Sequence, residues 1–360
     1  MRNLLVTGGA GFIGSNFIHF ILKTEPEVQV TNLDALTYAG SLENLHDLAN
    51  PHRHTFVHGD ICDAQLVVDL LVRQKIDTIV HFAAETHVDR SIDNPGLFVR
   101  TNIIGTQTLL EAARRYWLVE GALGQQQVHF HHVSTDEVFG DLAPDDPPWT
   151  EDTPYAPSSP YSASKAASDH LVRAYGHTYD LPYTITNCSN NYGPYQFPEK
   201  LIPLMISNLL EGKPLPVYGD GGQIRDWLYV EDHCEAIWMV IKSGQMGETY
   251  NIGGDNQPTN LTVVNTLCDI ADELLPDSPH VPHHNLLQFV KDRPGHDRRY
   301  AMDSTKIRRE LGWRPRHSLE SGLLDTARWY MKYSDWITAV QQNSDYQQWI
   351  ERNYKNREVQ

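Results

Sequence analysis

The stretch TGGAGFIG, residues 7–14, decides the fold of this chain. It follows an apolar run at residues 4–6 and opens a helix-spaced apolar pattern at 12–22. Glycines at this spacing permit a tight turn and let backbone N–H groups approach a pyrophosphate at the start of the helix. Asp34 ends the next apolar run, where a carboxylate can accept hydrogen bonds from the adenosine ribose hydroxyls and would repel a 2′-phosphate. We therefore expect a dinucleotide site that favours NAD over NADP.

The first half of the chain alternates short apolar runs with helix-spaced patterns. We expect buried strands at residues 4–6, 28–33, 55–58, 78–82 and 128–133, and helices at 12–22, 64–74 and 98–116. Strands that alternate with helices form a parallel sheet covered on both faces. The pattern therefore predicts an α/β protein with a doubly wound parallel Rossmann sheet.

The character of the sequence changes after about residue 187, where proline, glycine and asparagine become dense. We expect a smaller, discontinuous mixed α/β domain for the substrate, formed by residues 189–226 and 253–350. Residues 1–188 would form the NAD-binding domain, and residues 227–252, with an apolar helix and a strand-like end, would return to it.

Composition excludes several classes of protein. The 360 residues carry 29 Lys and Arg against 46 Asp and Glu, a net charge of −17. This balance argues against a nucleic-acid surface, and it means that an anionic substrate needs a local basic pocket. Cys62, Cys188, Cys234 and Cys268 form no C-x-x-C pair, as expected for buried thiols in a reducing compartment. No apolar run approaches a membrane span, so we expect a cytoplasmic protein with no membrane partner.

Tyr161 and Lys165 form a Y-x-x-x-K pair. On a helix these positions share one face, so the phenol and the ammonium can reach a common ligand. A nearby cation and a nicotinamide charge would lower the pKa of the tyrosine and make it a base for a substrate hydroxyl. The pair alone often occurs by chance on an exposed helix, but its place after a Rossmann half favours a catalytic pair.

Thr135, Asp136 and Glu137 follow the apolar run at 128–133. Groups at the carboxyl ends of parallel strands face the ligand crevice, and two carboxyls in different environments can divide into an acid and a base. Elimination of water needs such a pair. A solvated acidic turn explains the same residues equally well, and their spacing does not distinguish the two interpretations.

The chain contains 18 histidines, and His129 and His131 alternate along an expected strand. Alternating histidines can bind a metal, but no cysteine or carboxylate set follows at ligand spacing. We expect packed or surface imidazoles and no metal.

Taken together, the motifs resemble those of the dTDP-glucose 4,6-dehydratases, members of the extended short-chain dehydrogenase/reductase family. The resemblance covers essentially the whole chain and is carried by residues 7–14, 81–91, 134–137, 161–165, 187–194, 197–203, 225–227 and 292–297. The Thr-Asp-Glu triplet is its most specific element. One departure is Thr86, where many relatives are expected to have serine, and it keeps the hydroxyl.

The resemblance implies a role for each catalytic residue. Tyr161 would be the base for oxidation of the sugar at C4, with Lys165 lowering its pKa and holding the nicotinamide ribose. Thr135 would hydrogen-bond the C4 oxygen, Glu137 would take the C5 proton, and Asp136 would protonate the departing C6 hydroxyl. The hydride would return to C6 and give dTDP-4-keto-6-deoxyglucose, so NAD would be regenerated in each turnover.

The resemblance also implies two sets of binding residues. The NAD site would comprise Gly8, Gly11, Phe12, Ile13, Gly14, Asp34, Ala35, Leu36, Thr37, Asp60, Ile61, Phe82, Ala83, Ala84, Glu85, Thr86, Thr101, Tyr161, Lys165 and Asn191. The site for dTDP-glucose would comprise Thr86, Thr135, Asn190, Lys200, Leu201, Pro216, Val217, Tyr218, Arg225, Asn260, Asp292, Arg293, Pro294, Gly295 and His296. Arg225 and Arg293 are the best diphosphate partners, because a guanidinium binds phosphate oxygens bidentately; a surface ion pair is the simpler interpretation of either.

Three other functions remain in competition. A nucleotide-sugar 4-epimerase would use Tyr161 and Lys165 without needing the two carboxyls. A dehydratase for another nucleotide-hexose, such as GDP-mannose, is expected to have a non-acidic residue in place of Asp136. A non-catalytic NAD sensor would be free to lose Tyr161, Lys165 and Glu137. Family members pair through the helices around residues 98–116 and after Tyr161, so a homodimer is expected.

Overall fold

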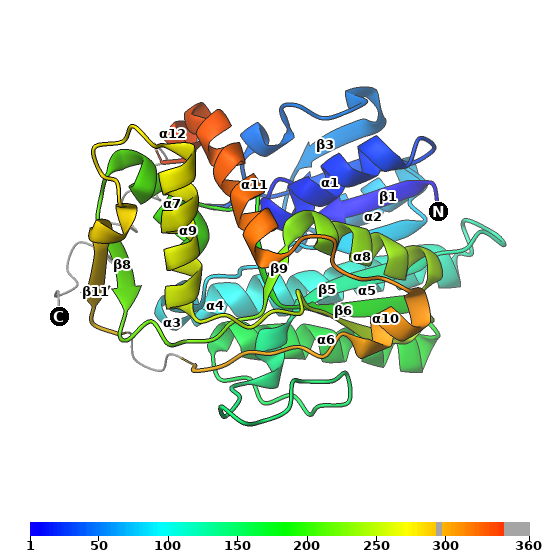
Figure 1. The fold of residues 1–360 in the computed structure, drawn as a ribbon. Helices are drawn as coiled ribbons and strands as arrows, with labels where there is room; N and C mark the ends of the chain where they lie inside the picture. The colour runs from blue at the N-terminus through cyan, green and yellow to red at the C-terminus, as the bar shows by residue number, and fades with distance from the viewer. Residues whose placement is uncertain (293–296, 342–360) are drawn as a thin grey trace.

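The computed structural model describes residues 1–292 and 297–341. Its centre is a parallel seven-stranded sheet with the strand order β10-β6-β5-β4-β1-β2-β3 (Figure 1). These strands are β1 (Asn3–Thr7), β2 (Gln29–Asp34), β3 (His54–His58), β4 (Thr78–His81), β5 (His129–Thr135), β6 (Tyr183–Cys188) and β10 (Thr249–Ile252). The five expected strands are confirmed to within two residues at each end. The chain order reverses between β1 and β4, which makes this a doubly wound Rossmann sheet.

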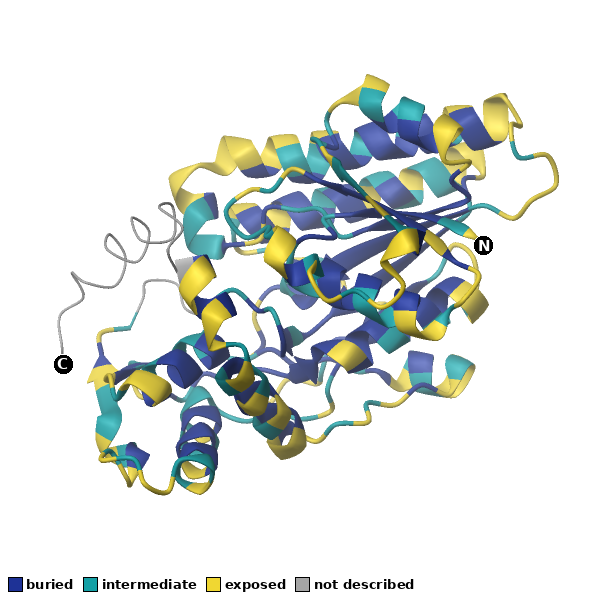
Figure 2. Ribbon diagram, turned by 90° about the horizontal axis from the view of Figure 1, so that it is seen from above, coloured by how far each residue is buried: buried dark blue, intermediate teal, exposed yellow. Residues whose placement is uncertain are grey.

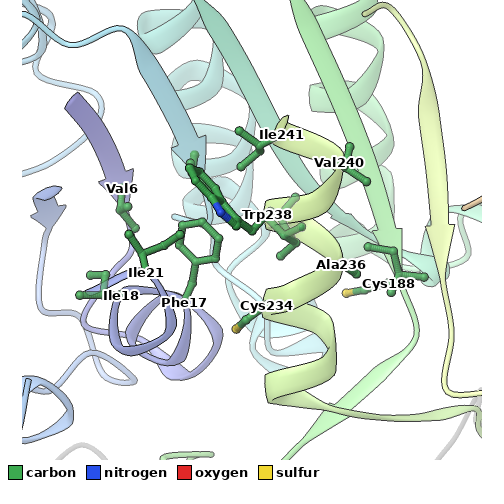
Figure 3. Close-up of a cluster of buried hydrophobic side chains, with 14 of the residues drawn as sticks. Val6, Phe17, Ile18, Ile21, Cys188, Cys234, Ala236, Trp238, Val240 and Ile241 are labelled. Carbon is green, nitrogen blue, oxygen red and sulfur yellow. The ribbon is translucent and has the colours of Figure 1, made fainter. Parts of the chain in front are cut away.

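Alternate residues of β1 supply two separate cores. Leu4 and Val6 pack on one face against α1 (Phe12–Thr24) and α8 (Val230–Ser243). On this face Phe17 from α1 meets Trp238 from α8, with ring centroids 6.4 Å apart (Figure 3). Leu5 packs on the other face, in the core that α2 (Ala64–Arg73) and α5 (Thr106–Ala113) complete. The sheet is therefore buried between two helical layers whose outer surfaces are exposed (Figure 2).

The helix expected at residues 98–116 is longer and less regular than the sequence pattern indicates. It comprises α4 (Pro95–Phe98), the π-helical turn η3 (Val99–Gly105), α5 and the π-helical turn η4 (Arg114–Val119). The short α3 (Val88–Asp93) precedes it, and α6 (Pro160–Tyr179) packs against η3 and α5. The shorter helical turns in this half are η1 (Leu42–Leu45), η2 (Pro51–Arg53) and η5 (Asp136–Phe139).

A second, smaller group of elements lies beside the carboxyl ends of the strands (Figure 1). It contains α7 (Leu201–Glu211), α9 (Asn260–Leu274), α11 (Leu319–Lys332), α12 (Ser334–Gln341), η6 (His283–Leu286), and the parallel pair β8 (Leu215–Tyr218) and β11 (Leu287–Val290). These helices share one hydrophobic core that includes Ile206, Leu267 and Leu323. The fold is therefore α/β with a Rossmann sheet and a smaller mixed part, as predicted.

The parallel pair β7 (Asn190–Tyr192) and β9 (Trp227–Tyr229) connects the two groups, because β9 packs against both α8 and α11. The helix α10 (Thr305–Leu311) packs against β10 and α8 of the Rossmann group. None of the helices within residues 1–292 and 297–341 combines the length and apolarity that crossing a bilayer requires.

Candidate active site

The glycine loop between β1 and α1 requires glycine at two positions. Gly8 has a φ of +73°, and a Cβ there would lie 2.7 Å from the amide nitrogen of Ala83. A Cβ on Gly14 would lie 2.3 Å from the carbonyl oxygen of Gly8. The loop therefore packs closely against the residues that follow β4, and side chains at these positions would push α1 away from the sheet.

The first turn of α1 is open to a ligand. Gly11 is the N-cap residue, so it offers no side-chain cap, and the first turn contains no acidic residue. The first N–H groups of a helix lack partners within the helix and carry its positive dipole end. This end of α1 therefore has the chemistry to hold the diphosphate of a dinucleotide.

Asp34 links this loop to the end of β2. Its two carboxylate oxygens accept hydrogen bonds from the backbone N–H groups of Ala10 and Leu36, both at 2.8 Å. Burial raises the pKa of Asp34, although these two N–H groups oppose the rise. Each oxygen keeps capacity for a second donor, so a ribose hydroxyl can still be bound.

A cavity of about 400 Å³ opens at the carboxyl ends of the strands, where the chain order reverses. It brings together the expected catalytic residues Thr135, Asp136, Glu137, Tyr161 and Lys165. It is also lined by Gly8, Gly11, Phe12, Ile13, Gly14, Asp34, Ala35, Thr37, Asp60, Ile61, Phe82, Ala83, Ala84, Glu85, Thr86, Thr101 and Asn191. Leu36 is the one expected NAD residue that does not line it, because its backbone turns to bond Asp34.

Tyr161 and Lys165 lie in the first turns of α6. Ser159 caps this helix through a reciprocal pair of hydrogen bonds with Ser162, which fixes the start of the helix beside the cavity. The ammonium of Lys165 donates to the carbonyl oxygen of Val133 on β5 at 2.8 Å. Both side chains are buried, so the pair is not on an exposed helix face.

The expected lowering of the Tyr161 pKa is not produced by the protein groups. Burial of the phenol raises its pKa well above the ordinary value, and the nearby Glu137 raises it further, while a hydrogen bond with Thr135 lowers it. The cause is the desolvation of the phenolate in a cavity that also contains two carboxyls. The surrounding protein groups by themselves therefore disfavour the phenolate form of Tyr161.

The Thr-Asp-Glu triplet is part of the cavity wall and not a solvated turn. Asp136 is only 2% exposed and begins the short helical turn η5, with Thr135 as its N-cap. Burial raises the pKa of Asp136 well above its usual value, and the proximity of Glu137 and Asp226 adds to the rise. Burial therefore favours the protonated form of Asp136, whereas Glu137 is only partly buried.

The expected substrate residues divide into two groups. Thr86, Asn190 and Lys200 line the cavity together with Thr135. Leu201, Pro216, Val217, Tyr218, Arg225, Asn260 and Asp292 do not line it. The positions 293–296, expected as Arg293, Pro294, Gly295 and His296, lie outside the described residues.

Arg225 is not the surface ion pair that the simpler interpretation suggested. It is buried, its guanidinium lies over the Tyr300 ring at 4.2 Å, and it donates to the carbonyl oxygen of Asp297 at 2.9 Å. Its charge also opposes the rise in the pKa of Asp136. Arg225 therefore places a buried positive charge near the acidic pair, although it does not line the cavity itself.

The sequence analysis missed several residues of the cavity wall. Tyr38 and Glu199 line it, and Arg90 connects them by lying 3.7 Å over the Tyr38 ring and 3.8 Å from a Glu199 oxygen. Glu199 directly precedes Lys200 in the motif at residues 197–203, and this position could have indicated that Glu199 belongs to the site. Tyr38 follows the expected Asp34–Thr37 segment directly.

His129 and His131 are packed inside the sheet, as expected. Both rings contact the Thr184 hydroxyl of β6 at 2.8 Å, and burial lowers the pKa of His129 to about 4. Within the described part of the chain, no group of three or more His, Cys, Asp or Glu side chains could hold a metal ion.

Comparison with known proteins decides the family. A family model described as GDP-mannose 4,6 dehydratase matches residues 5–326. A curated dTDP-glucose 4,6-dehydratase from Salmonella typhimurium is 54% identical over 363 residues, which covers 99% of both chains. The chain belongs to the family of the dTDP-glucose 4,6-dehydratases. The description of the family model names GDP-mannose as the substrate. This chain nevertheless has the acidic residue Asp136, which a GDP-mannose enzyme was expected to lack.

Solved structures show how far the fold is shared. DesIV, a dTDP-glucose 4,6-dehydratase from Streptomyces venezuelae solved with NAD bound, has a TM-score of 0.83 and 47% identity over 94% of this chain and all of its own. The UDP-glucose 4-epimerase from Thermotoga maritima has a TM-score of 0.80 but 28% identity, over 92% of this chain and 99% of its own. The fold is common to dehydratases and epimerases, so the choice between them depends on sequence and on the carboxyl pair.

Proposed function

We propose that this enzyme converts dTDP-glucose to dTDP-4-keto-6-deoxyglucose and water with a tightly held NAD. The observation that carries the proposal is that Asp136 and Glu137 line the same cavity as Tyr161 and Lys165. An oxidation pair and an elimination pair in the same cavity match a reaction that oxidises one carbon and removes water from the next two.

The residues of the glycine loop fit NAD. The open first turn of α1 would bind the diphosphate, Asp34 would bind the adenosine ribose, and Lys165 would hold the nicotinamide ribose. When bound, NAD supplies the acceptor for the C4 hydride and later the donor of a hydride to C6. The positive charge of its nicotinamide ring would also favour ionisation of Tyr161, which the surrounding protein groups disfavour.

Tyr161 takes the proton of the C4 hydroxyl, while Thr135 hydrogen-bonds the C4 oxygen. The resulting ketone acidifies the C5–H bond, which makes elimination feasible. Glu137 removes the C5 proton, and the neutral acid Asp136 protonates the C6 hydroxyl so that it leaves as water. General acid and base groups of this kind each contribute roughly 10²- to 10⁴-fold to the rate.

Two sugar nucleotides distinguish the candidate functions. Incubation with dTDP-glucose should give a 4-keto product that develops a chromophore in alkali, and UDP-glucose should give much less. An epimerase would form a C4 epimer and no such chromophore. A sensor without activity would bind NAD and leave both sugars unchanged.

We also propose that residues 1–188 with 227–252 form the NAD domain, and that residues 189–226 and 253–350 form the sugar-nucleotide domain. The pairing of β10 with β6 supports the first assignment. The shared core of α7, α9 and α11 supports the second, of which residues 342–350 lie outside the described part. A cytoplasmic location is supported by four free cysteines, which suit a reducing compartment.

A homodimer is supported by an apolar face on the helices that were expected to pair. Ile92, Leu97, Val99 and Ile104 of α3, α4 and η3 are all exposed. Replacing Ile104 by Glu should give monomers in sedimentation, because it places a charge in the interface. Val72 of α2 is equally exposed, 48% for both residues, so Val72→Glu is the matched control and should leave the dimer intact. A wild-type monomer at micromolar concentration would contradict the proposal.

A further inference from the structure

At the end of the proposed reaction, on which this inference rests, one proton lies on a different residue of the enzyme than at the start. Tyr161 begins as phenolate and ends protonated, because it keeps the proton of the C4 hydroxyl. Asp136 begins protonated and ends as carboxylate, because its proton leaves in the water molecule. Glu137 returns to its starting state, since the proton that it takes from C5 goes back to C5 when the hydride reaches C6.

The starting and spent forms of the enzyme therefore contain the same number of protons. They differ only in whether one proton lies on Tyr161 or on Asp136. A second turnover requires that this proton move from the phenol to the carboxylate. The structure shows which group lies between the two.

Thr135 interacts with both residues. Its hydroxyl donates to Oδ1 of Asp136 at 3.2 Å, and it is close enough to the Tyr161 phenol to lower the pKa of that group through a hydrogen bond. The N–H of Glu137 donates to the same hydroxyl at 3.3 Å and makes Thr135 the N-cap of η5, which holds its side chain in place. A hydroxyl can accept one proton while it donates another.

Solvent has poor access to both ends of this path. Tyr161 is 7% exposed, Thr135 8% and Asp136 2%. Among the described residues, Oδ2 of Asp136 has no hydrogen-bond partner. A carboxylate left in this position after a turnover is costly, which favours its rapid reprotonation from the nearest donor.

We propose that the Thr135 hydroxyl resets the active site by relaying the proton of Tyr161 to Asp136 after each turnover. Thr135 accepts the phenolic proton as it gives its own proton to Asp136, so one O–H bond forms and one breaks on its oxygen. Phenolate and carboxylic acid are restored, and no external acid or base takes part. Thr135 thus acts between turnovers in addition to its contact with the C4 oxygen.

Comparison of the first turnover with later ones tests the relay. Thr135→Val has nearly the same shape but no hydroxyl, and Thr135→Ser keeps the hydroxyl. Enzyme with bound NAD is mixed with a few equivalents of dTDP-glucose and quenched at short times, and the 4-keto product is counted per active site. Thr135→Val should form its first equivalent at a rate lowered by the lost contact with the C4 oxygen, and each later equivalent roughly 10²-fold more slowly still, which is the scale of a lost general acid.

Slow product release would also give a burst, so the enzyme is stripped of product by gel filtration and given fresh substrate after increasing delays. Thr135→Val should recover its burst only slowly. The wild type and Thr135→Ser should recover it at the shortest delay. First and later turnovers slowed equally in Thr135→Val would overturn the relay and leave Thr135 with its contact to the substrate alone.

The wild type provides a test that does not depend on how a variant folds. In weak buffer with a pH indicator, an internal relay predicts no transient release of a proton during a single turnover. Release of about one proton per site, followed by uptake, would show that the reset passes through solvent and would refute the relay. Failure of the wild type to form the 4-keto sugar would instead refute the proposed function.

Discussion

Asp169 lies one helical turn after Lys165 on α6 and is the buried counter-charge of its ammonium. Its carboxylate accepts hydrogen bonds from Ser134 at 2.8 Å and Tyr155 at 2.9 Å, and it lies 3.1 Å from the His132 ring. Burial alone would raise the pKa of Asp169, but His132, Lys165 and the Ser134 hydroxyl together bring it below its usual value. In turn, Asp169 is the main group that opposes the lowering of the Lys165 pKa by burial.

Asp169→Asn should shift the alkaline limb of kcat to lower pH. Without the carboxylate, burial lowers the pKa of Lys165 further. The ammonium therefore loses its proton at a lower pH than in the wild type. His132, Arg173, Cys188 and Asp136 also lie around this network and are unchanged in the variant. The pH profile of kcat measures the shift; the matched control is Asp69→Asn on exposed α2, which should leave the profile as in wild type. An unshifted alkaline limb in Asp169→Asn would show that Asp169 does not hold up the pKa of Lys165.

Glu137→Gln should keep NAD bound and lose turnover by roughly 10²- to 10⁴-fold, because the base for the C5 proton is removed while the side-chain shape is kept. Exchange of the C5 proton with heavy water, followed by NMR, measures the step directly. Undiminished exchange would assign the base to another residue.

Gly8→Ala should lower both NAD content and stability. The left-handed φ costs roughly 1–2 kcal/mol for a residue with a Cβ, and the new Cβ would also collide with Ala83. Gly121 has a φ of +57° and nothing within 4 Å of its Cβ position, so Gly121→Ala carries the backbone cost alone. Urea unfolding and bound NAD should both distinguish the two variants; equal effects would mean that the contact with β4 is unimportant.

Asp226 should make the protein less stable as pH rises from about 4 to about 7. Burial raises its pKa from 3.8 to about 7 in the folded protein. The folded state therefore binds the proton more tightly than the unfolded state, and stability falls through this window by up to roughly 4 kcal/mol and is constant above it. Asp226→Asn should flatten the dependence of the unfolding midpoint on pH; an unchanged slope would contradict the raised pKa.

Local patterns were enough to predict the cofactor half of the site. The glycine loop, Asp34 and the Y-x-x-x-K pair each follow from the order of strand, turn and helix, and the parallel sheet then brings them to one edge. β6 was not singled out, because Thr184 and Thr186 interrupt its apolar pattern. The two hydroxyls are buried and both contact His131 on β5.

The remainder of the site depends on contacts between segments far apart in the chain. No periodicity connects Arg90 with Tyr38 and Glu199, and none shows that Arg225 is buried beneath Tyr300. Whether the Thr-Asp-Glu triplet was a solvated turn or a cavity wall also depended on tertiary burial. Asp169 could have been noticed, since it is four residues after Lys165 on the same helix face.

The most direct test of the central claim is the fate of the hydrogen at C4. With dTDP-glucose deuterated at C4, the account predicts deuterium in the C6 methyl group of the 4-keto product, transferred within each molecule. Tyr161→Phe should form neither transient NADH nor labelled product. A 4-keto product from the wild type with no deuterium in its methyl group would contradict the account.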